Sequence, residues 1–442
     1  MIDPIGKSVH SIRWDAFSDK AQKKLLLCLL ANLAVGIAGR SAMRMPQPAA
    51  GAGHLLLDGG QTPSARDAAF YNAALMHART QDDFHPIGNL HLATVILPAL
   101  LAQAESSPEI SGRDFLEAMA TGYACATGLS AQFSPLGTPR GLRSTSLYSA
   151  MGAAAAVARL RGQDAAGIAN TIALASQSAF GTTQCWRDGS DEYQLHVGNG
   201  ASQAILCAQL TDAGVHGGTH ALDGPSGFYP ALLGQVPAFD TIAADFDAEA
   251  SILKTVLKRY PVSGICQPVV LLSERLAAAL GTQRVQSVRV EMNAFEMNYP
   301  GTLNAGPVYK SFSDRLMSAR FCVSSVLENG HFDFAAFVRP LSAEGSRIIA
   351  ATDVQSADDL GTLSCRIRIT TTEGQTIQGE LRDGGDQLTI DWSSIDEWCA
   401  QLWKEAGRLP RYGQALRSAV EDLPKTGFAP LRQALLGSGA PA

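Results

Sequence analysis

The chain contains no closely spaced pair of cysteines, which argues against a zinc site built from cysteine ligands. The eight cysteines among its 442 residues are scattered through mostly apolar segments, without a CxxC pair. Thiols placed in this way are typical of reduced core residues in a cytoplasmic protein. Two enzyme fingerprints are also missing. No serine stands in a GxSxG elbow, and the Gly198-x-Gly200 motif has no preceding strand and no third glycine, so neither a serine hydrolase nor a dinucleotide-binding protein is expected.

Charged residues are scarce as well, at 17% of the chain, and they sum to a formal net charge of −6. This balance does not favour nucleic acids or anionic membranes as partners. The apolar run at residues 25–37 is interrupted by Asn32 and Gly36 and is shorter than the roughly 20 apolar residues of a membrane span. The first residues lack the apolar core of a secretory signal. We therefore expect a cytoplasmic protein that acts without a membrane.

The sequence predicts a mainly α-helical protein with a smaller α+β part. Alanine and glycine dominate residues 147–179, where so many small side chains allow close helix packing. Beyond residue 280, apolar and polar residues alternate, which is typical of strands. We expect strands at 285–293, 346–354, 363–372 and 376–382, and helices at 313–330 and 332–341. The predicted domains are a helical domain at 1–264, with 395–442 packing back onto it, and an α/β domain at 265–394.

The most distinctive stretch runs from residue 77 to residue 101. It contains three histidines and two adjacent carboxylates directly before an apolar helical run; these residues are His77, Asp82, Asp83, His85 and His91. The unpaired N–H groups and positive dipole at a helix start favour an anion there and can tune a nearby His or Asp. A proline and a glycine between the second and third histidines predict that a turn, rather than helix periodicity, places their imidazoles.

Three interpretations of this stretch are open. Its ligand types suit a transition metal, but the spacing matches no known ligand motif, so we expect no metal. General acid–base catalysis is favoured, because histidine titrates near neutrality and a neighbouring carboxylate can orient it. The third possibility is that the histidines are buried and only satisfy hydrogen bonds.

Other candidates carry weaker signals. Arg140 and Arg143 lie in a Pro/Gly-rich loop, where an arginine can grip a carboxylate in bidentate fashion. The segment 258–260 (Lys-Arg-Tyr) is either an ordinary helix end with favourable cations or a functional group, namely a carboxylate clamp or a proton donor. Tyr193 and His196, which we expect just before a helix starting near Gly198, are further acid–base candidates.

Several of these segments resemble the MmgE/PrpD family, in the family's order along the chain. They are AAFYNAALMHARTQDDFH with the following VILPALLAQAE, GLRSTSLYSAMGAAAAVARLRG, NTIALASQSAFGTTQCWRDGS, YQLHVGNGASQAILCAQLTDAG, LKRYPVSGI and SARFCVSSVLENG. The resemblance implies a large helical domain built from the N-terminal part and the C-terminal tail. It also implies an inserted α/β lid domain, an active site in the cleft, a homodimer and catalysis without a cofactor.

The family pattern carries over to only some positions. His91 matches the family's active-site histidine, Lys258 matches the lysine of its K-x-Y-P motif, and residues 82–83 match its DD pair. Other positions depart from the pattern. Thr80 replaces an aspartate, and Phe84 replaces a threonine. Arg143 replaces the histidine of the family's G-x-H-P-T motif, Tyr193 replaces a lysine, and Ser325 replaces a tyrosine.

The resulting hypothesis is a lyase that moves a proton next to a carbonyl or carboxylate of a small carboxylate-bearing substrate. The first alternative is an isomerase or epimerase that acts on a similar substrate. The second alternative is an inactive or repurposed binding protein. The predicted catalytic residues are His91 as base or acid, Asp83 as its orienting group, Lys258 for charge neutralisation and Tyr193 as a second proton carrier. The residues expected to contact the substrate are Thr80, His85, Arg143 and Arg259.

Overall fold

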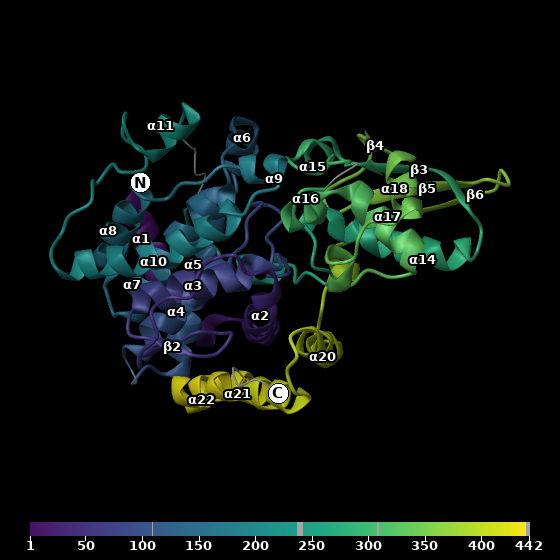
Figure 1. Cartoon of the computed structure of the whole chain (residues 1–442). Coiled ribbons are helices and arrows are strands. Elements are labelled where there is room, and N and C mark those ends of the chain that lie inside the picture. The colour runs from purple at the N-terminus through teal and green to yellow at the C-terminus, as the bar shows by residue number, and fades with distance from the viewer. Residues whose placement is uncertain (108, 237–241, 307–308, 439–442) are drawn as a thin grey trace. The chain divides into compact units, whose positions relative to one another are not determined.

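The computed structural model describes residues 1–442 except 108, 237–241, 307–308 and 439–442 (Figure 1). The chain divides into two compact units. Unit 1 comprises Met1–Thr182, Glu192–Thr255 and Asp391–Ala442, and unit 2 comprises Thr183–Asp191 and Val256–Ile390. The boundaries of unit 2 therefore differ by several residues from the predicted 265–394, and unit 2 also takes in a short segment near residue 187. The predicted fold class, mainly α with a smaller α/β part, is confirmed.

Unit 1 is built from helices and one short two-stranded ribbon. Its α-helices are α1 Ile2–His10, α2 Asp19–Ala38, α3 Ala65–Ala78, α4 Ala93–Glu105, α5 Gly112–Ser130, α6 Ser134–Gly137, α7 Ala150–Leu160, α8 Ala165–Ser176, α10 Glu192–Asp212, α11 Phe228–Leu233, α12 Ile242–Asp245, α13 Ala248–Lys254, α20 Ile395–Glu405, α21 Pro410–Thr426 and α22 Phe428–Ser438. The ribbon pairs β1 (His54–Leu55) with β2 (Gln61–Thr62). Helix α3 packs against α2, α4 and α10, so the segment that follows α3 starts inside the helical core.

The small side chains of the chain allow the close helix packing predicted from the sequence. A Cβ atom added to Gly152 of α7 would lie 2.6 Å from the carbonyl oxygen of Gly122 on α5. Any side chain at this position would overlap the neighbouring backbone. The crossing of α5 and α7 therefore depends on glycine.

Helix α2 is the apolar helix of the N-terminal region. The Ser18 side chain accepts a hydrogen bond from the N–H of Ala21 and caps the helix. Residues Asp19–Ala42 are long and apolar enough to cross a membrane by length and composition, but 89% of the apolar window is buried inside the protein. Such burial is typical of the core helix of a globular domain. Asn32, which interrupts the run, is itself buried and bonds to the chain near residue 83.

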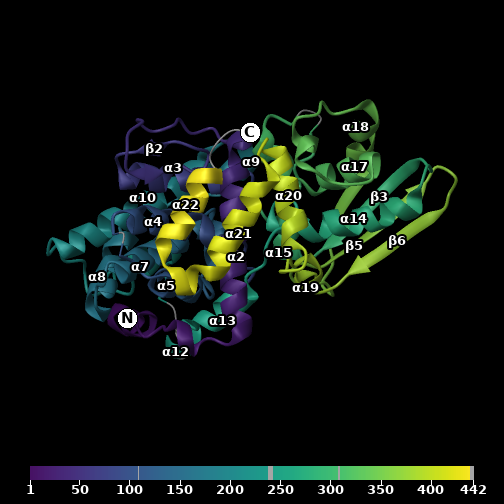
Figure 2. The ribbon, with the colours of Figure 1, turned by 90° about the horizontal axis from the view of Figure 1, so that it is seen from below.

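The C-terminal helices return to unit 1, where α21 runs beside α2 (Figure 2). Three arginines fix this return. Arg79, directly after α3, forms a partly buried ion pair with Glu405 at the end of α20. Arg432 of α22 lies 2.9 Å from Glu105 of α4, and Arg408 donates a 2.8 Å hydrogen bond to the carbonyl of residue 58. The tail is therefore attached to the segments that flank the His-rich stretch.

Unit 2 contains a four-stranded mixed sheet in the order β4-β3-β5-β6, where β3 is parallel to β4 and antiparallel to β5. Its elements are α9 Gln184–Asp188, α14 Gln267–Leu280, β3 Val285–Met292, α15 Ala294–Asn298, α16 Phe312–Met317, α17 Ala319–Asn329, α18 Ala343–Ala350, β4 Thr352–Ser356, β5 Cys365–Thr371, β6 Thr376–Leu381 and α19 Gly385–Leu388. Helix α14 packs against β5 and β6.

Two sequence predictions for unit 2 are wrong. The segment 346–354 was expected to be one strand, but most of it belongs to α18, because Ser342 caps a helix there by accepting from the N–H of Gly345. The helix expected at 332–341 is only a short 3-10 turn at Phe334–Phe337.

Candidate active site

The His-rich stretch begins with a strained turn at the end of α3. Thr80 has a φ of +49°, although a β-branched side chain rarely adopts this conformation. Its N–H donates a 2.9 Å hydrogen bond to the carbonyl of His77, which closes the helix. Strained residues of this kind cluster at functional sites. The turn redirects the chain just before Asp82 and Asp83, whose carboxylates have different partners.

The carboxylate of Asp83 organises the start of α4. One oxygen accepts hydrogen bonds from the N–H groups of Leu92 (3.1 Å) and Ala93 (3.0 Å), and the other accepts from the hydroxyl of Tyr123. The N–H of Asp83 donates to Asn32 at 2.9 Å. Burial raises the pKa of Asp83 to about 6, and these donors oppose the shift. The predicted orienting role of Asp83 toward His91 therefore involves only its backbone carbonyl.

The carboxylate of Asp82 is shared by two histidines. Its oxygens lie 3.0 Å from Nδ1 of His77 and 3.1 Å from Nδ1 of His91. The same Nδ1 of His91 lies 2.8 Å from the carbonyl oxygen of Asp83. Both neighbours of this nitrogen are acceptors, so we assign the hydrogen to Nδ1. In neutral His91 the basic lone pair is then on Nε2.

The backbone of His91 is held by a π-helical turn at Thr145–Ser149. Its N–H donates to the hydroxyl of Thr145 (3.2 Å), and its carbonyl accepts from the hydroxyl of Ser149 (2.7 Å). Such turns are frequent at functional sites. The side chain of His91 keeps 17% of its surface exposed, whereas that of Asp82 is fully buried. This imidazole therefore lies at the edge of the group formed by His77, Asp82 and His91, which we call the buried cluster.

Arg143 joins the cluster from the opposite side of His77. Its Nη2 donates to Nε2 of His77 at 2.6 Å, and its Nη1 donates to the carbonyl of Tyr193 at 3.1 Å and lies 3.4 Å from Nδ1 of His196. Burial lowers the pKa of His77 to about 3 despite the nearby Asp82, so this imidazole is neutral. Arg143 was expected to hold a substrate carboxylate. Its guanidinium bonds to His77 and to the carbonyl of Tyr193, and the role toward a substrate stays a prediction.

Tyr193 and His196 lie within α10, whose first residue is Glu192, and not before a helix start as the sequence suggested. The glycines of the Gly198-x-Gly200 motif are therefore inside the helix. The hydroxyl of Tyr193 donates to the carbonyl of Ala78 at 3.1 Å and accepts from the side chain of Gln194 at 3.0 Å. These bonds connect α10 to the end of α3.

The remaining predicted site residues are His85, Lys258 and Arg259. His85 is buried, its Nδ1 accepts from the N–H of Gly88 at 3.2 Å, and burial lowers its pKa to about 4. A backbone bridge between His85 and Leu90 closes the turn predicted for this segment. Lys258 and Arg259 belong to unit 2, where Lys258 is buried. Their predicted roles depend on the family resemblance.

A metal ion is a possible occupant by residue type, since ligand atoms of His77, Asp82 and His91 lie within 4.8 Å of one another. The donors do not fit this role. Arg143 donates to Nε2 of His77, so Nδ1 of that ring carries a hydrogen and has no lone pair for a metal. The cluster is arranged for hydrogen bonding instead.

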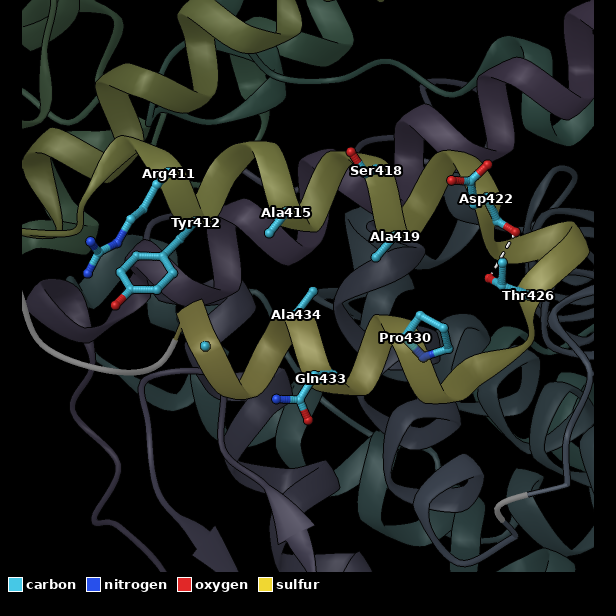
Figure 3. A pocket seen from close by; sticks show the side chains of 11 residues that line it. Arg411, Tyr412, Ala415, Ser418, Ala419, Asp422, Thr426, Pro430, Gln433 and Ala434 are labelled. Atoms are coloured by element: carbon cyan, nitrogen blue, oxygen red, sulfur yellow. Dashed lines mark hydrogen bonds between the residues drawn. The ribbon is translucent and has the colours of Figure 1, made fainter.

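A separate groove of about 630 Å³ lies between α21 and α22 (Figure 3). Small and apolar side chains such as Ala415, Ala419, Pro430 and Ala434 form much of its wall. The described residues that line it include no histidine or lysine. Among these residues, the groove therefore lacks the imidazoles of the buried cluster.

Sequence reasoning overlooked the importance of three residues. His196 was named only as a further acid–base candidate, and His77 and Asp82 only as members of the His-rich stretch, so none of the three was among the predicted catalytic or substrate-binding residues. His77 lies in the last turn of α3, five residues before Asp82, and the two are joined by the strained turn. His196 follows Tyr193 by three residues, which places both on one face of a helix. This spacing was visible, but the expected helix start was too late to reveal it.

Comparison with known proteins gives matches to one family. The family model of the MmgE/PrpD N-terminal domain matches residues 3–239. A cis-aconitate decarboxylase-like protein of Aspergillus oryzae is 30% identical over 149 residues, which cover 31% of this chain and 31% of that protein. Human cis-aconitate decarboxylase is 30% identical over 167 residues, which cover 36% of this chain and 34% of that protein. The alignments thus span about a third of the length of these curated relatives.

Proposed function

The chain belongs to the MmgE/PrpD family, and on that basis we propose that it is a cofactor-independent lyase acting on a small carboxylate-bearing substrate. Two relatives with similar sequences are named as cis-aconitate decarboxylase or a protein like it, which supports lyase chemistry. The observation that carries the proposal is the Asp82 carboxylate beside Nδ1 of His91. A carboxylate at Nδ1 fixes the tautomer and stabilises the imidazolium that forms when Nε2 takes a proton.

The proposed reaction starts with His91 removing the proton next to a carbonyl or carboxylate of the substrate. The electron pair of the broken C–H bond forms a C=C bond as a leaving group departs from the adjacent carbon with its own bonding pair. For a hydroxyl leaving group, the imidazolium returns the proton and water leaves, so His91 ends neutral. Asp82 remains ionised throughout and balances the transient positive charge.

Lys258 is proposed to neutralise the negative charge of the substrate. This role follows from its match to the family's K-x-Y-P lysine. A Lys258→Met variant is expected to lose activity in the assay described below, because methionine fills a similar volume without the charge. Retention of full activity by this variant would remove Lys258 from the proposal.

The test is proton NMR of the purified protein in D2O with a panel of di- and tricarboxylates and their hydroxy analogues. Incorporation of solvent deuterium at a substrate carbon, together with an unsaturated product, supports the lyase. Deuterium incorporation with inversion and no elimination would instead indicate an epimerase. No exchange or product across the panel, from a folded protein, would favour a binding protein.

The decisive variant is His91→Asn. The asparagine amide can replace the Nδ1–H donor toward the carbonyl of Asp83, but it has no base at the position of Nε2. We expect a rate loss of about 10²–10⁴-fold with little change in folding. His220→Asn is the matched control, because the side chain of His220 is 74% exposed and lies outside the cluster. A full rate for His91→Asn would refute the assignment of the base.

A further inference from the structure

His196 occupies a second defined position next to Arg143. Nδ1 of His196 lies 3.4 Å from Nη1 of Arg143, while the Nη2 of the same guanidinium donates to His77. A guanidinium has no acceptor, so Nδ1 of His196 must be the accepting nitrogen. The hydrogen of this ring is therefore on Nε2. His91 has the opposite arrangement, with its hydrogen on Nδ1.

The Nε2–H group of His196 has no hydrogen-bond acceptor among the described residues. The residue is only partly buried, and the contact with Arg143 is the one hydrogen bond that its ring makes among the described residues. Burial, together with the charge of Arg143, lowers the pKa of His196 to about 3, so the ring is neutral at physiological pH. A neutral imidazole held beside a positive charge can act as an electrophile, a role in which it donates a hydrogen bond without losing its proton.

The backbone at Gly181 packs closely against His196. A Cβ atom added to Gly181 would lie 3.0 Å from Cγ of His196 and 2.3 Å from Oγ of Ser146. The backbone N–H of Arg143 donates to the carbonyl of the same glycine at 3.0 Å. The glycine therefore brings the chain close to both members of the Arg143–His196 pair.

His196 shares a helix face with Tyr193, the position at which the family resemblance implies a lysine. The hydroxyl of Tyr193 bonds to Ala78 and Gln194, and thus to the protein itself. His196 lies three residues later on the same helix, which places it on the same face. His196 can therefore supply a hydrogen-bond donor from the helix face that also carries Tyr193.

We propose that His196 is a catalytic residue that contacts the substrate through Nε2–H and stabilises the oxyanion formed when His91 removes the proton. This inference rests on the proposed function. The negative charge develops on the carbonyl or carboxylate oxygen next to the deprotonated carbon, and His196 donates a hydrogen bond to that oxygen. His196 keeps its proton, so the proton balance of the reaction is unchanged.

The first test compares His196→Leu with His196→Gln in the deuterium-exchange assay. Leucine removes the donor, and loss of one oxyanion donor is expected to lower kcat by about 10²–10³-fold with a much smaller change in KM. Glutamine can place an N–H group near the position of Nε2, so we expect it to recover most of that loss. Leu195→Ala is the control for a change at the adjacent exposed position. Equal rates for the leucine variant and the wild type would overturn the proposal.

The second test needs no substrate. Nitrogen-15 NMR of the histidine rings distinguishes the two neutral tautomers and the imidazolium. We expect a neutral Nε2–H ring for His196 at pH 7, and a Nδ1–H ring or an imidazolium would overturn the inference. If the wild type shows no exchange with any substrate, the proposed function fails. If the wild type exchanges and only His91→Asn is impaired, the assignment of His196 fails alone.

Discussion

The buried cluster of unit 1 and the charged face of the unit 2 sheet use the same kinds of residues in opposite ways. In the cluster, desolvation dominates, and it lowers the pKa of His77 and His196 to about 3 and raises that of Asp83 to about 6. On the sheet face, Arg366 bonds to Glu291, Asp359 and Glu380 at 2.7 Å each. There the guanidinium groups of Arg382 and Arg366 lower the pKa of Asp359.

The difference is that one environment favours neutral forms and the other favours charged forms. Groups that strongly prefer their ionised state do not readily exchange protons near neutral pH. Groups held neutral, or poised near neutrality, can accept or donate a proton or a hydrogen bond during a reaction. Burial therefore identifies the candidate active site more clearly than the number of charges does.

The largest expected effect is on the rate of the Asp82→Asn variant. An amide has nearly the same shape, but it cannot stabilise the imidazolium of His91 as a carboxylate does. We expect a loss of about 10²–10⁴-fold in deuterium exchange. The equivalent change on the sheet face, Asp359→Asn, should leave the rate unchanged. Similar rates for both variants would remove the distinction between the two regions.

The next effect concerns the pH dependence of stability at Asp83. The pKa of Asp83 in the folded protein is about 6, above the 3.8 of an unperturbed aspartate, so the folded state holds this proton more tightly than the unfolded state. The stability from this group is fully present below about pH 4 and is lost as the pH rises through 6, by about 3 kcal/mol in total. Asp83→Asn stays neutral and should not show this loss. Urea denaturation of both proteins between pH 4 and pH 7 measures the difference, and a constant difference would contradict the raised pKa.

A smaller effect is expected for Tyr123→Phe, which removes the hydroxyl that donates to Asp83. The variant should lose about 1–2 kcal/mol of folding free energy at pH 7. The loss should shrink toward pH 4, because the protonated carboxyl group depends less on that donor. Thermal unfolding at the two pH values is the measurement. An equal loss at both would mean that the hydroxyl does not support the ionised form.

The smallest effect is expected for Arg366→Gln on the sheet face. Its ion pairs are partly exposed to solvent and screened by salt, so we expect a change in Tm of about 2 °C or less, which disappears at 1 M NaCl. A large and salt-independent change would show that this network is as important to stability as buried charges are.

The fold class followed from composition and periodicity, because helix caps and apolar faces are local properties. Ser18 and Ser64, for example, cap the helices that follow them, through their side chains. The site was harder to predict. Whether the carboxylate of Asp82 or that of Asp83 faces His91 depends on the turn at Thr80. The positive φ of this turn cannot be predicted from a threonine in the sequence.

His196 was named from the sequence only as a further acid–base candidate, and its specific position could not be predicted for a different reason. Its significance comes from Arg143, a residue more than fifty positions earlier, and this proximity is created by the packing of α10 against the π-helical turn at Thr145–Ser149. The sequence also gave no means of deciding where the glycines inside α10 would fall relative to its first turn. Contacts between distant segments determine the roles of these residues.

The ion pair between Arg79 and Glu405 also concerns the order in which the ribosome makes the protein. Its two residues are 326 positions apart, so the arginine beside Thr80 emerges long before its carboxylate partner exists. The whole of unit 2 is synthesised in the interval. A nascent chain that is almost complete therefore already contains His77, Asp82 and His91, yet the helices that secure their segment have not been translated. Final assembly of this region can occur only at the end of synthesis.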